Sequence, residues 1–169
     1  TAAQLAATSR VLRGFNDTLS VHCLNIAREI FDNTGKDNPR VLFSKIQTAV
    51  ELYLTTGEEV YLNFLIDNQE SIIKGINQTA WYTARVALQM EKMKSKKARK
   101  FAKAFRTALT GVETALQEQV KATPYGVPYR PHIWGAGWDI QGFGYRHYFL
   151  VSAYPEIFSV SPIFNALNF

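Results

Sequence analysis

Residues 123–148 read TPYGVPYRPHIWGAGWDIQGFGYRHY and differ in composition from the rest of the chain. This stretch holds three of the six prolines, five of the ten glycines and two of the three tryptophans. Before it, apolar residues recur at spacings of three and four, which is the pattern of amphipathic helices. We therefore expect a helical scaffold that carries one aromatic, turn-rich loop, and such loops are frequent sites of function.

The overall composition is that of a globular protein. Of the 169 residues, 47% are apolar and 20% are charged, which is sufficient for one domain with a hydrophobic core. A lone cysteine, Cys23, excludes an internal disulfide framework. No apolar run reaches the ~18 residues that a membrane-spanning helix needs. We expect residues 1–169 to be a single helical domain. Because the first residues already follow a helical pattern, we also expect this domain to be an incomplete segment of a larger one.

Glycine, proline and capping residues mark the ends of successive helices. Gly14, Gly35 and Gly57 follow the first three apolar stripes, and Pro39 suits the first turn of the third helix. The predicted helices cover about 1–13, 17–34, 39–56, 58–74, 79–93, 96–121, 140–153 and 162–169, and Asn16 or Asp17 can cap the second. Residues expected on their buried faces include Leu5, Ser9, Leu12, Leu19, Val60, Trp81, Phe101, Phe105, Leu109 and Leu116. Because no strand pattern is present, the predicted fold is all-α. Consecutive helix pairs of this kind form a bundle, an α-solenoid or a ring of helical hairpins.

The sequence contains no recognisable metal, nucleophile or nucleotide motif. His22, His132 and His147 are scattered, and they form no cluster with the spacing of metal ligands. Cys23 adjoins His22 on a helix, where neighbours point in different directions, so we expect Cys23 to be an inert core thiol. Residues 135–137 read Gly-Ala-Gly, without the third glycine or the preceding strand of a dinucleotide fingerprint.

Eight basic residues fall within 15 positions of the chain. They are Lys92, Lys94, Lys96, Lys97, Arg99, Lys100, Lys103 and Arg106. No aromatic residue is interleaved with them on the polar helix face, because Phe101 and Phe105 belong to the apolar stripe. Sites for single-stranded nucleic acid combine cations with stacking aromatics. We therefore favour a solvated helix junction over a phosphate-binding site and expect no nucleic-acid partner.

Aromatic residues crowd the loop itself. They are Tyr125, Tyr129, His132, Trp134, Trp138, Phe143, Tyr145 and Tyr148. One interpretation is that these rings fill a core, which we prefer for Phe143 and Tyr148. The other is an aromatic platform for a sugar, whose hydroxyls would bond to Arg130, His132 and Asp139. Covering roughly 100 Å² of apolar surface on one stacked ring gives at most about 2.5 kcal/mol, enough for one sugar subsite. From these residues alone, the two interpretations weigh about evenly.

Three segments of the chain resemble glycoside hydrolase family 9. Residues 123–139, TPYGVPYRPHIWGAGWD, resemble a segment of that family that reads N-P-[YF]-x-V-P, a short spacer, then W-G-S-N. Residues 49–65, AVELYLTTGEEVYLNFL, are similar to its recurring A-A-x-E-L-Y-x-x-T-G-[DE]-x-x-Y-L hairpin. Residues 2–32 are similar to its A-A-L-A-x-A-S-R-V-[LF] helix and the capped helix that follows. Together the segments occur in the family's order and cover most of the chain.

The resemblance implies an (α/α)6 barrel, a ring of six helical hairpins. It also implies an endoglucanase that cuts β-1,4-glucan with inversion, an extracellular or periplasmic parent protein, and at most a structural calcium ion. Inversion needs two carboxyl groups about 6.5–9.5 Å apart, one as general acid and one as general base. The family's motifs for both are absent from this sequence. We therefore assign no catalytic residue and predict that the 169-residue chain alone is inactive.

By resemblance, Trp134 is the tryptophan of the family's Trp-Gly pair in the sugar cleft. Ala136 and Gly137 replace the family's Ser-Asn, and Trp138 follows where a polar residue is common. The predicted sugar-binding residues are Trp134, Trp138, Tyr125, Tyr129, Arg130, His132 and Asp139. The expected partners are a β-glucan, the remainder of the parent chain and, through exposed apolar helix faces, other copies of the chain.

Two other functions remain open. The chain could be a non-catalytic helical module whose basic run, 92–106, meets an acidic partner. It could also be part of another (α/α) barrel enzyme that acts on acidic polysaccharide, with the same run steering the substrate.

Overall fold

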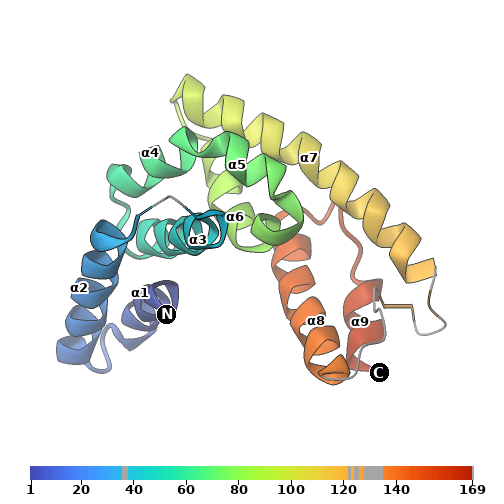
Figure 1. Cartoon of the computed structure of the whole chain (residues 1–169), viewed down its shortest axis with the longest axis horizontal. Coiled ribbons are helices and arrows are strands. Elements are labelled where there is room, and N and C mark those ends of the chain that lie inside the picture. Colours follow the sequence, from blue (N-terminus) through green and yellow to red (C-terminus); the bar gives the residue numbers. More distant parts are fainter. Residues whose placement is uncertain (36–37, 122, 124–125, 128–134, 169) are drawn as a thin grey trace. The chain divides into compact units, whose positions relative to one another are not determined.

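The computed structural model describes residues 1–35, 38–121, 123, 126–127 and 135–168, without the side chain of Ala136. Over these residues the chain is helical and contains no strand, which confirms the all-α prediction (Figure 1). The finer expectation, a place in an (α/α)6 barrel, stays a prediction.

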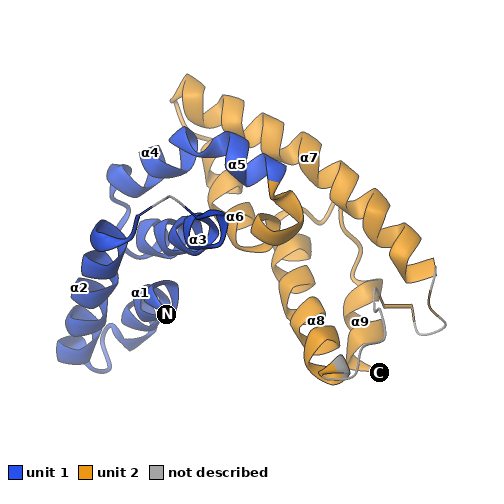
Figure 2. Cartoon of the chain, viewed as in Figure 1, with its two compact units in different colours: residues 1–74 blue, residues 75–169 orange. Residues whose placement is uncertain are grey.

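Two compact units divide the chain, residues 1–74 and 75–169 (Figure 2). Over the described residues, unit 1 contains α1 (Ala2–Leu12), α2 (Asp17–Asn33), α3 (Pro39–Thr56), α4 (Glu59–Asp67) and α5 (Gln69–Lys74). Unit 2 contains α6 (Ile76–Glu91), α7 (Lys96–Lys121), α8 (Ala136–Ala153) and α9 (Ser161–Leu167). The expectation of a single domain over residues 1–169 stays a prediction.

Side-chain caps and a glycine mark helix ends in unit 1, at Asn16 and Gly57 as predicted and at Asn38, which was not predicted. Asn16 accepts a hydrogen bond from the Leu19 N–H at 3.0 Å and so caps α2. Asn38 caps α3 in the same way. At the far end of α3, Gly57 has φ = 73° and donates its N–H to the Tyr53 carbonyl at 2.8 Å. Glycine adopts this left-handed conformation without strain, so α3 ends there.

Helix α1 packs on α2 and α3 through small residues. Its buried face consists of Ala2, Ala3, Ala6 and Ser9. The sequence predicted Leu5 and Leu12 as the inward stripe with alanines between, but these leucines are only half-buried. The small face lets α1 lie close to α2, where the Ser20 hydroxyl donates to the Ser9 carbonyl at 2.7 Å.

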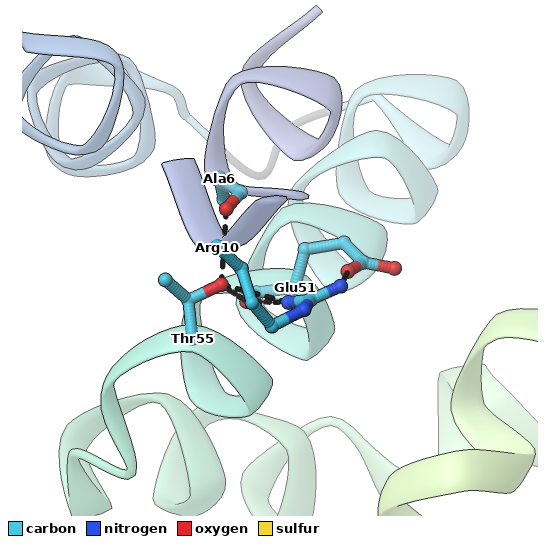
Figure 3. A network of polar contacts seen from close by, with 4 residues as sticks. All are labelled: Ala6, Arg10, Glu51 and Thr55. Atoms are coloured by element: carbon cyan, nitrogen blue, oxygen red, sulfur yellow. Dashed lines mark hydrogen bonds and ion pairs between the residues drawn. The ribbon is translucent and has the colours of Figure 1, made fainter. Parts of the chain in front are cut away.

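A polar network fixes α1 on α3 (Figure 3). Arg10 Nη2 donates to Glu51 Oε2 at 2.8 Å, and Arg10 Nη1 donates to Thr55 Oγ1 at 2.8 Å. Thr55 Oγ1 lies 3.0 Å from the Ala6 carbonyl, which ties the first turns of α1 into the network. Arg10 and Glu51 both occur in segments that carry the family resemblance. Their contacts here are structural ones within unit 1.

One predicted helix is two in the structure. The sequence predicted continuous helix over 58–74, but α4 ends at Asp67 and α5 begins at Gln69. The Asn68 side chain donates to the Phe64 carbonyl at 2.7 Å, a local bond that competes with helix continuation. Two residues predicted to face inward, Leu19 of α2 and Val60 of α4, are exposed.

Unit 2 has an aromatic core along α7. Ser95 accepts the Ala98 N–H and begins the helix, and Phe101, Phe105, Leu109 and Leu116 are buried as predicted. The Phe105 ring lies 6.0 Å from Phe101 and 6.5 Å from Tyr154. Arg106 pairs with Glu91 at 3.4 Å and with Glu156 at 2.5 Å, so this cation is held within the unit.

Helix α8 is longer than predicted. The sequence predicted a start at Ile140, but α8 begins at Ala136, directly after Gly135 with φ = 84°. Gly144 lies within α8. A Cβ at this position would lie 3.2 Å from the Ala166 Cβ, so glycine permits the close packing of α8 on α9. Phe143 packs on a buried cluster of Val127, Ile140 and Ala166, in line with the core interpretation.

Tyr148 contradicts the core interpretation. Its side chain is 57% exposed. Five residues turn an α-helix by about 140°, so Tyr148 lies on a different side of α8 from Phe143.

Candidate functional site

Helix α8 presents two different faces. One face follows a spacing of three and four residues and lines a cavity: Asp139, Phe143, Arg146, His147 and Leu150. The other carries exposed aromatic side chains: Trp138, Tyr145 and Tyr148, which are 82%, 59% and 57% exposed. The residues that the sequence groups as one aromatic stretch therefore divide between a cavity wall and the surface.

The cavity lies within unit 2, between α6, α7 and α8. Its volume is about 650 Å³, which is in the range of small-molecule sites. Apolar side chains line its interior, including Leu116 and Leu150, which are both buried. Exposed polar side chains lie around it: Asn77, Gln78, Gln119, Asp139 and Arg146. This distribution suits a ligand with an apolar face and polar edges.

Trp81 on α6 gives the cavity an aromatic wall. Its ring lies 5.9 Å from Tyr145 and 6.0 Å from Phe149, both on α8, and 5.2 Å from Tyr82. The Arg85 guanidinium lies 4.9 Å from the Phe149 ring on the same pair of helices. Because three rings hold the indole, and it is only half-buried, it offers a fixed aromatic surface.

His147 brings a neutral imidazole to the cavity wall. The side chain is 1% exposed, and Nε2 lies 2.8 Å from the Ser159 carbonyl. A carbonyl only accepts, so Nε2 carries the proton. Burial lowers the pKa of His147, against smaller opposing effects of the Ser159 bond and the Glu113 charge. Nδ1 is therefore an acceptor, and it has no hydrogen-bond partner in the described part of the chain.

Most of the predicted sugar-binding residues lie outside the described residues. These are Tyr125, Tyr129, Arg130, His132 and Trp134. Of the two that are described, Asp139 lines the cavity. Trp138 is on the exposed face of α8 and does not line it. Their role in sugar binding stays a prediction for all seven.

The sequence did not single out Trp81, Gln78, Arg146 or His147 as site residues. Trp81 was predicted only as part of a buried helix face. A signal was available, because the polar pair Asn77 and Gln78 lies three and four residues before Trp81 and so on the same side of α6. What the sequence did not provide was the pairing of α6 with α8 across the intervening 26-residue helix α7.

The cavity lining contains one carboxylate, Asp139, within the part of unit 2 that the structure describes. An acid and base pair for glycoside hydrolysis needs two. No group of three His, Cys, Asp or Glu side chains is placed to hold a metal ion over residues 1–35, 38–121 and 135–168. In the same described residues, no helix has the length and apolar character to cross a membrane.

Comparison with family models, with curated proteins and with solved structures finds no match to this chain. The resemblance to glycoside hydrolase family 9 therefore stays a prediction, based on the three segments quoted above.

Proposed function

We propose that the chain is part of a β-1,4-glucan hydrolase that resembles glycoside hydrolase family 9, and that the cavity of unit 2 holds one sugar unit of the glucan. The observation that carries this is the combination of a fixed indole, Trp81, with polar side chains around a cavity of about 650 Å³. In this proposal the helix pairs α6–α7 and α8–α9 are hairpins of an (α/α)6 barrel, and the parent protein is extracellular or periplasmic.

The chemistry of the cavity supports a pyranose. An indole face binds the C–H face of a sugar ring, and removing roughly 100 Å² of apolar surface gives at most about 2.5 kcal/mol. Gln78, Gln119 and Asp139 offer donors and acceptors to hydroxyl groups. A pyranose has both an apolar face and polar edges, which suit the apolar interior and the polar surround of the cavity.

The chain binds but does not cut in this proposal. Asp139 is the one carboxylate in the described lining, and inversion requires a second at about 6.5–9.5 Å. The general acid and general base would come from polypeptide beyond these residues. The expectation of at most a structural calcium ion in the parent protein stays a prediction.

Calorimetric titration with cellohexaose tests the proposal. The chain should bind cellohexaose, and Trp81→Ala should weaken binding by up to about 70-fold, the equivalent of about 2.5 kcal/mol. Asp139→Asn should weaken it less, because one hydroxyl partner is changed. Reducing-sugar release from soluble β-glucan should be absent in all variants.

Two controls separate binding from folding. Trp81→Phe keeps an aromatic ring near Tyr145 and Phe149 and should retain both the fold and part of the affinity. Tyr148→Ala removes an exposed ring on the face of α8 that does not line the cavity and should change affinity less than twofold. Equal loss in Tyr148→Ala and Trp81→Ala, or no binding by the folded wild-type chain, would contradict the proposal.

A further inference from the structure

The positive charge of the chain is concentrated at the start of α7. Eight of the 19 basic residues lie in residues 92–106, so the other 11 basic residues face 14 acidic ones. Without this segment the chain would be slightly acidic. The excess charge is therefore a local property of unit 2 and not a general feature of the surface.

Six lysines of this segment are exposed: Lys92, Lys94, Lys96, Lys97, Lys100 and Lys103. We call them the lysine row. None of them has an ion pair or hydrogen bond with another described residue. The two arginines differ, because Arg99 donates to the Met93 carbonyl at 3.4 Å and Arg106 is held by Glu91 and Glu156. The lysines thus remain available, whereas the arginines take part in contacts within unit 2.

Two lysines of the row, Lys96 and Lys97, lie in the first turn of α7, which is an unfavourable position for a cation. The N-terminus of a helix carries partial positive charge, and cations in its first turn are repelled. No acidic residue lies in the first turn of α7 to offset this repulsion. Lysines concentrated where they reduce helix stability, without internal partners, favour a role in binding an anion.

The row has a linear geometry. One side of α7 carries three of these lysines at positions i, i+4 and i+7: Lys96, Lys100 and Lys103. Seven residues of α-helix extend about 10 Å, and Lys92 and Lys94 continue the charge into the link before α7. Successive cations along a line match successive anions along an extended polymer.

The side chains around the lysine row indicate which kind of anionic polymer it suits. Over residues 92–110 no large hydrophobic side chain is exposed, so the row lacks the aromatic or apolar anchors of a stable protein interface. Phe101 and Phe105 are buried and cannot stack on bases. Lysine is a compact, strongly hydrated point charge and lacks the planar fork with which arginine pairs bidentately with carboxylate or phosphate, so the row suits repeated anions that need no bidentate pairing. These features fit hydrated carboxylates that repeat along a chain.

We propose that the lysine row binds a linear polysaccharide with a carboxylate on its repeating unit, a polyuronate. The site is separate from the cavity that Trp81 lines, and it does not depend on the glucan proposal. Binding is electrostatic and falls with salt, because each ammonium group releases counterions from the polymer.

Affinity electrophoresis and calorimetry with polygalacturonate test this proposal. In about 50 mM salt, the triple variant Lys96→Gln/Lys100→Gln/Lys103→Gln should bind polygalacturonate more than tenfold more weakly than the wild-type chain. Its dependence on salt should also be shallower. Loss of the fold is not the expected cause, since removing cations from the N-terminal turns of α7 should leave the melting temperature unchanged or higher.

A matched control removes the same amount of charge elsewhere. The triple variant Arg40→Gln/Lys74→Gln/Lys121→Gln changes three exposed cations outside the row. It should bind polygalacturonate within about twofold of the wild-type affinity. Equal loss in both variants would overturn the proposal, because net charge alone would then explain binding. Duplex DNA or polyglutamate bound as tightly as polygalacturonate, or no polygalacturonate binding at all, would overturn it as well.

Discussion

The two units differ in the side chains through which their helices pack. In unit 1, α1 packs on α2 and α3 through small side chains, and Arg10 of α1 pairs with Glu51 of α3 (Figure 3). Unit 2 uses large aromatic residues along α7, and it leaves a cavity, an exposed aromatic face on α8 and the lysine row. Groups left without partners after folding are the ones available to a ligand.

This difference separates the residues that carry the family resemblance from those that form the candidate site. Arg10, Glu51 and Gly57 fall in resemblance segments and act in unit 1 as structural contacts and a helix end. The cavity residues Trp81, Arg146 and His147 lie outside the quoted segments. Asp139 is the one residue of the described cavity lining that lies in a quoted segment.

The largest loss of unfolding free energy should come from a substitution in the aromatic core of unit 2. Phe105→Ala removes a fully buried ring that contacts Phe101 and Tyr154, and should cost about 3–5 kcal/mol of unfolding free energy. Urea denaturation measures this. Phe15→Ala, which removes an exposed ring, is the control and should cost less than about 0.5 kcal/mol. Similar costs for both would mean that Phe105 is not a core residue.

Breaking the polar network should have the next largest effect. Arg10→Met leaves Glu51 buried without its cation and should cost about 2–3 kcal/mol, somewhat less than for a fully buried pair because Arg10 is 34% exposed. Arg28→Met at the more exposed pair with Glu58 should cost less than about 1 kcal/mol. The double variant Arg10→Met/Glu51→Leu should recover much of the loss, and failure to recover would argue against an uncompensated charge as its cause.

Protonation of His147 should make the stability of unit 2 depend on pH. Because burial lowers the pKa of His147 below its usual value near 6.5, the unfolded chain binds a proton first as the pH falls. Stability should thus decrease from pH 7 towards pH 5, by at most about 1.4 kcal/mol per pH unit. In His147→Gln this part of the slope should disappear. Parallel pH profiles for the variant and the wild-type chain would exclude His147 as the source.

The smallest changes in unfolding free energy should come from replacing two glycines with alanine, and the two changes should have opposite signs. Gly57→Ala in unit 1 places a Cβ at φ = 73° and should cost about 1 kcal/mol. Gly111→Ala in unit 2 lies within α7, where nothing approaches within 4 Å, and should stabilise by about 0.5–1 kcal/mol. Thermal unfolding of both variants gives the signs. Two changes of the same sign would contradict the assigned roles.

The sequence predicted most helices correctly because their stripes and caps are local signals. Gly57 and Asn16 are examples, since each acts through its own backbone. The division of 58–74 was missed because the apolar stripe continues across Asn68, whose side chain donates to the Phe64 carbonyl at the break. Tyr148 was misplaced because an aromatic cluster in sequence does not reveal which side of a helix each ring occupies. The cavity was missed because it needs three helices to come together, and Asp139 was the one residue of its lining that the sequence singled out for sugar binding.

The central claim is that a sugar binds beside the indole of Trp81. Three tryptophans give three indole N–H signals in a proton–nitrogen NMR spectrum, and Trp→Phe variants assign them. On titration with cellohexaose, the signal of Trp81 should shift and saturate. The same spectrum reports on Trp134, the residue that the family resemblance links to the sugar. No change at Trp81 at saturating cellohexaose, or a change at Trp138 alone, would contradict the account.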